Sequence, residues 1–180
     1  MKNFLLIFLF FFGISIVAQE KKMTANGNIT FEASVPYYEA VEAKNNQVFT
    51  LLNTKNGDIT FIILIKDFHF ERSLMEDHFN ANYMESKRHP KATFKGSIEK
   101  FSIKNLTADP SEYLIKGKIN IHGVNKNIKV LATLSKTVKN AVIIQSNFAL
   151  NTDDFRIDIP YIVRSKISKN VNVTLNSELQ

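Results

Sequence analysis

Alternation of apolar and polar side chains, with a period of two residues, is the feature that most constrains this chain. Residues 28–35 place Ile29, Phe31, Ala33 and Val35 on one face, and later segments repeat the pattern. Successive side chains of a β-strand point to opposite faces, so each segment predicts a strand with one buried face. We predict strands at 28–35, 47–53, 58–68, 92–101, 113–122, 128–135, 142–150 and 171–179. About eight strands linked mostly by hairpins indicate an all-β, antiparallel sandwich or barrel.

Short turn sequences separate these segments. Asn56-Gly57 tolerates the positive φ angles that a tight hairpin requires, and Gly123–Lys126 and Asn140 predict two later turns. Residues 61–65 are apolar at consecutive positions. This run predicts a strand that is covered on both faces.

One segment, residues 72–84, has a helical rather than a strand pattern. Its apolar side chains recur at four-residue steps and share one side of a helix: Met75, Phe79 and Tyr83. Ser73 and Glu76 have the spacing of a capping box, which predicts the start of the helix. We expect this short helix to cap one end of the barrel.

The first 18 residues have the layout of a secretory signal peptide. Lys2 precedes an apolar run from Phe4 to Val17, and the small residue Ala18 follows. The run is shorter than the roughly 20 residues of a membrane helix, although an uncleaved N-terminal anchor is the alternative interpretation. We therefore predict a signal peptide at 1–18, a single domain at 19–180 with no membrane span, and a periplasmic or secreted location.

The composition of the remaining chain excludes several classes of function. Without residues 1–18 it has 22 basic and 17 acidic residues, a net charge of +5, and the basic residues are scattered. A scattered excess of this size does not indicate nucleic-acid binding. The absence of cysteine excludes disulfides, thiolate metal sites and a cysteine nucleophile.

The residues that could support catalysis or metal binding show no supporting pattern. No two histidines have the spacing that brings imidazoles together on one helix or strand, and the four are His69, His78, His89 and His122. Adjacent acids such as Asp153-Asp154 diverge, and no nucleophile or phosphate-loop motif is present. We predict no enzyme activity, no metal and no cofactor. The remaining alternative is an enzyme in which His78 and His89 converge with an acid.

The predicted inward faces mix large and small side chains. Phe31, Phe61 and Phe94 share them with small residues such as Ala92 and Gly96. A barrel of about eight strands can be filled by its own side chains or hold one slim ligand. Small inward residues favour an apolar space, whereas interlocking of large with small residues would fill it. The alternation alone leaves both outcomes open.

Three stretches, taken in order, resemble the YceI-like family. Residues 75–96 resemble the family's helix that ends in an acidic-His-Phe sequence and is followed by Pro-x-Ala-x-Phe entering a strand. Residues 117–130 are similar to its hairpin with a small turn, and Asp154–Ile157 matches its Asp-Phe-x-Ile. The resemblance extends from about Gly27 to Leu179.

This resemblance implies a lipocalin-like barrel, usually exported to the bacterial periplasm, that binds a polyisoprenoid or a similar long apolar chain. Arg72, His78 and Asn82 would meet a head group. The region before Lys44 is shorter than in the longer members of the family, so we expect one wall of the pocket, and with it the ligand length, to differ. The chain would lie among inward apolar residues: Phe31, Phe61, Ile63, Met75, Phe79, Phe94, Ile98, Ile115, Ile119, Val130, Ile144 and Phe148.

The main alternative to a lipid-binding protein is a filled barrel that acts as a structural or interaction module of the cell envelope. That module would use an exposed surface such as the loop 104–112. A homodimer is left open in both cases.

Overall fold

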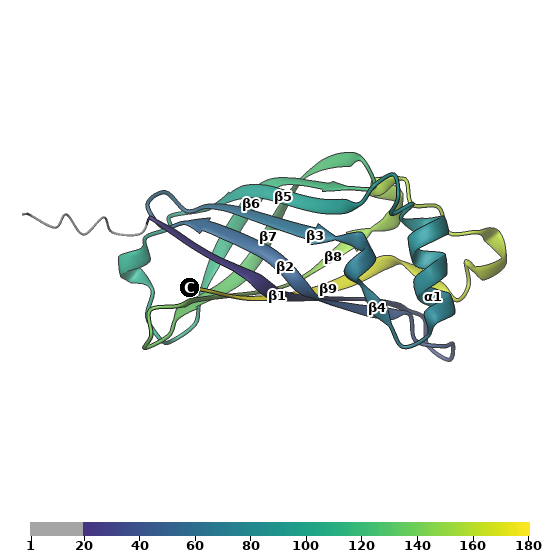
Figure 1. Cartoon of the computed structure of the whole chain (residues 1–180), viewed down its shortest axis with the longest axis horizontal. Coiled ribbons are helices and arrows are strands. Elements are labelled where there is room, and N and C mark those ends of the chain that lie inside the picture. The colour runs from purple at the N-terminus through teal and green to yellow at the C-terminus, as the bar shows by residue number, and fades with distance from the viewer. Residues whose placement is uncertain (1–19) are drawn as a thin grey trace, which may run out of the picture.

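The computed structural model describes residues 20–180, and the expected signal peptide at 1–18 lies outside the described residues. Nine strands, two turns of helix beside them and several 3-10 turns make up this part of the chain (Figure 1). The strands are β1 (Lys21–Ser34), β2 (Glu42–Asn53), β3 (Asp58–Leu64), β4 (His69–Phe70), β5 (Lys91–Ile98), β6 (Ser111–Ile121), β7 (Val124–Lys136), β8 (Val142–Asn151) and β9 (Ile167–Leu179). No helix in this range is long and apolar enough to span a membrane.

The strands close into an antiparallel barrel, one of the two architectures that the alternation predicted. The order around the sheet is β1-β9-β8-β7-β6-β5-β3-β2, and β2 pairs again with β1. The two-residue strand β4 pairs with the start of β2 and stands outside this ring of eight. Closure leaves no free edge among the eight strands, so the backbone donors and acceptors are paired around the ring.

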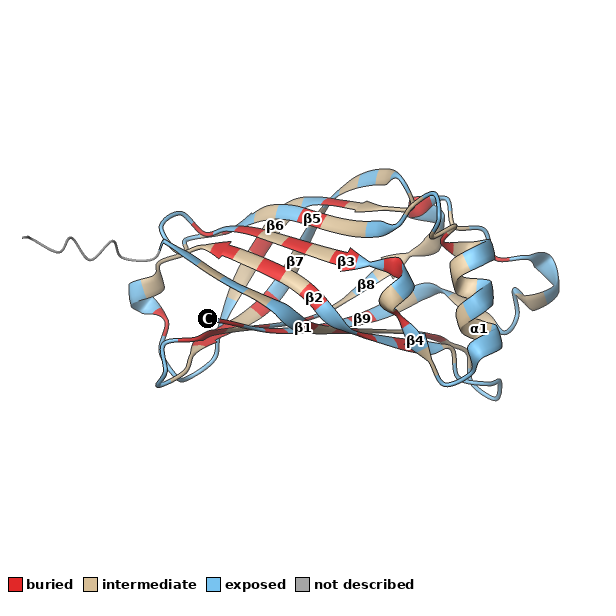
Figure 2. Ribbon diagram, viewed as in Figure 1, coloured by how far each residue is buried: buried red, intermediate tan, exposed pale blue. Residues whose placement is uncertain are grey.

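Alternation is visible along the strands, where buried residues alternate with more exposed ones (Figure 2). The expectation that β3 is covered on both faces was wrong. Ile63 is buried, but its neighbour Leu64 is 39% exposed and Ile62 is only half-buried. The outward side chains of β3 face solvent because no second layer packs over this wall of the barrel.

The predicted helix is present at one end of the barrel, in two parts. Helix α1 (Ser73–His78) continues directly into a π-helical turn, η2 (Phe79–Tyr83). The capping-box prediction was wrong, because Arg72 occupies the N-cap position and no side chain caps the helix. Glu76 Oε2 instead accepts a hydrogen bond from the Phe70 N–H at 3.2 Å, which joins the helix to β4.

Four 3-10 turns cover the two ends of the barrel. The turns η4 (Thr152–Phe155) and η5 (Tyr161–Val163) lie between β8 and β9, at the same end as α1, and η1 (Ile65–Asp67) precedes β4. At the other end η3 (Ile103–Asn105) lies in the β5–β6 connection, where the Lys136 N–H donates to the Thr107 carbonyl at 2.7 Å.

The predicted turns are present, and one of them begins a residue earlier than predicted. Gly57 and Asn140 have positive φ angles at the expected places. The β6–β7 turn consists of His122 and Gly123, with φ of 51° and 75°, and Ile121 pairs directly with Val124. Two successive positive φ angles make a type I′ turn, whose twist matches that of the strands. The turn therefore begins one residue before the predicted Gly123.

Candidate ligand cavity

The barrel contains an elongated cavity of about 520 Å³ beneath α1 and η2. Inward residues of the strands form its wall, and on β8 they run from Ile144 through Phe148 to Leu150. At about 3.4 Å per residue this wall extends for about 20 Å along the strand. Such a shape suits an extended molecule, and the volume lies within the range of small-molecule sites, about 300–1,000 Å³.

Eleven of the twelve predicted ligand-binding residues line this cavity: Phe31, Phe61, Ile63, Met75, Phe79, Phe94, Ile115, Ile119, Val130, Ile144 and Phe148. Ile98 does not, although it pairs across the sheet with Ile115. Ile98 is 3% exposed and packs in the core cluster of the barrel. Binding of a ligand by these residues stays a prediction.

An aromatic cluster of Phe31, Phe68, Phe70 and Phe79 lines the cavity at its helical end. The ring of Phe79 stacks on Phe31 at a centroid distance of 5.4 Å and meets Phe68 and Phe70 at 5.7 and 5.2 Å. Aromatic pairs at such distances each contribute about 0.5–1.5 kcal/mol beyond burial. We call α1 and η2 together the lid helix. Phe79 therefore packs the lid helix against β1 and β4. Phe79 also lines the cavity, as do Met75 and Tyr83.

Small inward residues leave space in one part of the barrel and not in another. Ala33 and Ala92 line the cavity. In contrast, a Cβ added to Gly96 or Gly117 would lie 2.7 or 2.5 Å from Cζ of Phe94, so that ring already fills the space above both glycines. The barrel is therefore hollow beside Ala33 and Ala92, and it is filled by interlocking side chains beside Gly96 and Gly117.

The wall of the cavity contains few polar side chains. His78 lines it, as do Glu39 and Lys166, and Glu39 forms an ion pair with Arg72 Nε. Asn82 is exposed and does not line the cavity. Burial raises the pKa of the Tyr83 phenol above its usual value of about 10, so Tyr83 presents a neutral hydroxyl. Within residues 20–180, the buried Thr152 Oγ1 has no hydrogen-bond partner.

Sequence reasoning missed the part of the wall that the β8–β9 connection supplies. Phe155, Ile157, Ile159 and Val163 line the cavity from this connection. The Arg164 guanidinium donates to the Ile159 carbonyl at 3.1 Å and holds the loop in place. The matched Asp-Phe-x-Ile stretch was the available signal, but an irregular loop gives no period from which an inward direction follows.

His78 and His89 do not converge in the fold. His78 lines the cavity, whereas the ring of His89 contacts that of His122 at a centroid distance of 4.7 Å. The linear spacing of the histidines gave no indication of this second contact, because the β6–β7 turn and the segment before β5 meet only in the closed barrel.

Comparisons with known proteins agree with this architecture. A polyisoprenoid binding domain from Saccharophagus degradans, implicated in plant cell wall breakdown, superposes with a TM-score of 0.79 at 12% identity, covering 89% of this chain and 98% of that one. Burkholderia cenocepacia BcnA gives 0.64 at 14% identity, covering 87% and 97%. The Campylobacter jejuni YceI protein gives 0.56 at 18% identity, covering 73% and 78%.

No curated protein sequence matches the chain. The likeness to these solved structures establishes the fold alone, because all three identities are low. The sequence model of the YceI-like domain, however, matches residues 19–179, which is nearly the whole chain. The protein therefore belongs to the YceI-like family.

Proposed function

We propose that this protein is exported and holds a long apolar chain, of the polyisoprenoid type, inside its barrel. The observation that carries the proposal is the elongated cavity beneath the lid helix, whose wall is built from inward apolar residues of the strands. The Saccharophagus degradans domain of the same fold is described as polyisoprenoid binding, which supports this ligand class.

Desolvation supplies the affinity in this proposal. Each methylene that leaves water for the cavity contributes about 0.8 kcal/mol, so a chain of many carbons binds without directional contacts. Polar groups also line the wall, among them His78, Glu39 and Lys166, and in this proposal they meet the head group. The cavity then selects for length and slimness more than for particular functional groups.

Binding rather than catalysis fits the residues of the wall. Among the described residues, the wall contains one histidine and one carboxylate, His78 and Glu39, and the Glu39 carboxylate is paired with Arg72. General acid–base catalysis needs a proton donor and acceptor held at a reacting bond. The alternative of a filled interaction module leaves the cavity without a role.

Lipid analysis of the purified protein tests the proposal. The full chain is produced in a bacterial host, purified without detergent and extracted with organic solvent for mass spectrometry. We expect about one equivalent of a long-chain lipid per protein. Recovery of no stoichiometric lipid from native preparations would count against the function.

A matched pair of variants tests whether the lipid lies in the cavity. Ala92 lines the cavity, whereas Ala149 is exposed on the outer face of β8. Ala92→Phe fills the space and is expected to reduce the bound lipid at least tenfold, while Ala149→Phe adds the same side chain outside and leaves it unchanged. Equal lipid content in the two variants would place the lipid elsewhere.

Export is tested on the same material by the mass of the mature chain. A start near Gln19 is expected after removal of residues 1–18, and recovery from the periplasm or medium should accompany it. A chain that keeps Met1 in the cytoplasm would contradict the export proposal and leave the lipid proposal intact.

A further inference from the structure

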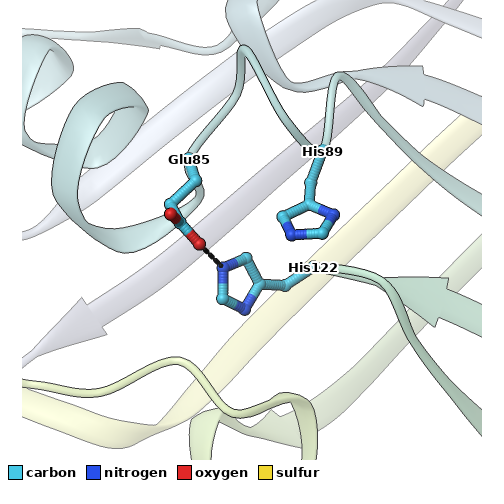
Figure 3. A group of neighbouring side chains, drawn as sticks. All are labelled: Glu85, His89 and His122. Atoms are coloured by element: carbon cyan, nitrogen blue, oxygen red, sulfur yellow. Dashed lines mark hydrogen bonds and ion pairs between the residues drawn. The ribbon is translucent and has the colours of Figure 1, made fainter.

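Glu85, His89 and His122 form a compact cluster outside the cavity, at the end covered by the lid helix (Figure 3). One ligand atom from each lies within 4.8 Å of those of the other two. Glu85 follows η2, His89 precedes β5 and His122 lies in the β6–β7 turn. Two separate stretches of the chain, the turn 85–89 and the β6–β7 turn, therefore bring two imidazoles and a carboxylate to one point.

The backbone that presents these groups is tightly constrained. Glu85 and His122 have positive φ angles of 44° and 51°, which few residues other than glycine adopt without support from the surrounding structure. The Glu85 carbonyl accepts hydrogen bonds from the Arg88 and His89 N–H groups at 2.7 and 2.9 Å. This turn fixes Glu85 and His89 relative to each other.

The hydrogen bonds of His122 determine which of its nitrogens carries the proton. Nδ1 lies 3.2 Å from the Phe155 carbonyl oxygen, which can only accept, so Nδ1 is the protonated nitrogen. Nε2 of the neutral ring then has a free lone pair, yet it lies 3.1 Å from Glu85 Oε2, which is also an acceptor. This contact is favourable only with a second proton or a cation between the two atoms.

His89 adds a second imidazole beside this pair of acceptors. Its ring is inclined at 67° to that of His122 and lies against Gly123, where an added Cβ would come within 2.8 Å of His89 Cε1. The absence of a side chain at Gly123 therefore gives the His89 ring its place. The Arg88 side chain is 75% exposed and reaches Glu85 Oε2 only at 3.9 Å.

We propose that Glu85, His89 and His122 bind a divalent transition-metal ion of the zinc class. Two histidines and one carboxylate are a ligand set that Zn²⁺ uses with a fourth position left to water. The hydrogen bond from His122 Nδ1 to the Phe155 carbonyl is the kind of outer contact that orients a metal-bound imidazole. The Glu85 side chain is 44% exposed, so an ion from solvent can reach its carboxylate.

The bound ion would connect the end of the lid to the barrel. Met84, Ile121 and Phe155 line the cavity, and each is a chain neighbour or the hydrogen-bond partner of a metal ligand. Metal binding therefore stabilises the segment after η2 against the β6–β7 turn and η4. The proposal does not depend on whether the barrel holds a lipid.

Zinc binding by the full chain, purified with a tag that contains no histidine, tests the proposal. Equilibrium dialysis against Zn²⁺ with metal analysis should give one ion per chain, and hydrogen exchange of residues 84–91 should slow when Zn²⁺ is bound. Glu85→Gln, His89→Ala and His122→Ala should each weaken binding at least ~10-fold. Glu85→Gln is the variant that keeps the fold, because its amide N–H can donate to Nε2 of His122.

The control is His69→Ala, which removes a histidine that also lies beside a carboxylate, with Nδ1 3.4 Å from Glu76 Oε2. His69 is not part of the cluster of Glu85, His89 and His122. This variant should bind Zn²⁺ like the unaltered protein. The proposal is overturned if the unaltered protein takes up no zinc, or if Glu85→Gln and His122→Ala bind it unchanged. It is also overturned if imidazole nitrogen spectra show His122 doubly protonated in the presence of excess Zn²⁺.

Discussion

The two ends of the barrel are built from the same strands, yet one is solid and the other hollow. The packed end comprises Leu52, Ile59, Ile98, Leu134, Val142 and Leu179, which are 0–3% exposed and do not line the cavity. The hollow end holds the cavity beneath α1 and η2. The same alternation of side chains therefore occurs at the packed end and at the hollow end. It shows which side chains point inward, but not whether side chains from opposite walls touch each other.

What differs between the ends is how the chain crosses the barrel opening. At the packed end the β5–β6 connection brings Leu106 over the core, where it is 3% exposed. At the hollow end the lid helix and the β8–β9 connection span the opening from its rim, and their apolar residues line a space rather than fill it. The cavity is thus made by the connections as much as by the strands.

The largest expected contrast is in stability. Leu134 at the packed end is 1% exposed, whereas Leu150 lines the cavity and is half-buried. Leu134→Ala should lower the free energy of unfolding by about 2–5 kcal/mol, because it opens a void in a close-packed core. Leu150→Ala should cost about 1 kcal/mol in lipid-free protein, because its inward side already lacks packing partners. Urea unfolding measures both values, and equal losses would remove the distinction between the ends.

The lid is expected to give the next largest effect, on ligand binding. Phe79 lines the cavity and contacts three other aromatic rings, while Leu74 on the same helix is 64% exposed. Phe79→Ala should weaken binding of an isoprenoid probe at least ~10-fold, because it removes apolar surface worth about 1.5–3 kcal/mol. Leu74→Ala should leave binding unchanged. The dissociation constants of the two variants are compared by titration with a fluorescently labelled isoprenoid probe. Equal affinities would show that the lid does not contact the ligand.

The smallest contrast concerns buried hydroxyls. The hydroxyls of Thr50 and Ser177 are hydrogen-bonded to each other at 2.9 Å in the interior. Thr50→Val leaves Ser177 unpaired and should cost about 1–2 kcal/mol of stability. Thr152→Val should cost less than about 0.5 kcal/mol in lipid-free protein, since Thr152 Oγ1 has no partner among the described residues. A larger loss for Thr152→Val in thermal unfolding would mean that this hydroxyl is satisfied.

Strand positions and the direction of side chains could be predicted from the sequence, because alternation reports them directly. Depth along the barrel could not. Ile98 and Ile115 are paired across two strands, and only Ile115 lines the cavity, so the cavity ends at this pair. The alternation gives no sign of where along the strands that end lies. The Met75, Phe79 and Tyr83 spacing predicted the lid correctly, although the start of the helix was placed one residue from its cap.

The histidine cluster shows a different limit. His89 and His122 are far apart in the sequence and meet because the β6–β7 turn consists of His122 and Gly123 rather than starting at Gly123. A shift of one residue in a turn decides whether an imidazole has a partner, and the alternation of side chains does not show at which residue this turn begins.

The contrast between the ends is tested most directly by methyl NMR of the lipid-free protein with a linear isoprenoid alcohol of about 15 carbons. Intermolecular contacts should appear at the methyl groups of Ile63, Ile115, Ile119 and Ile144, which line the cavity. The methyl groups of Ile59, Ile98 and Leu134 should show none. Saturable contacts at the packed end, or only at exposed residues of the outer surface, would contradict the account.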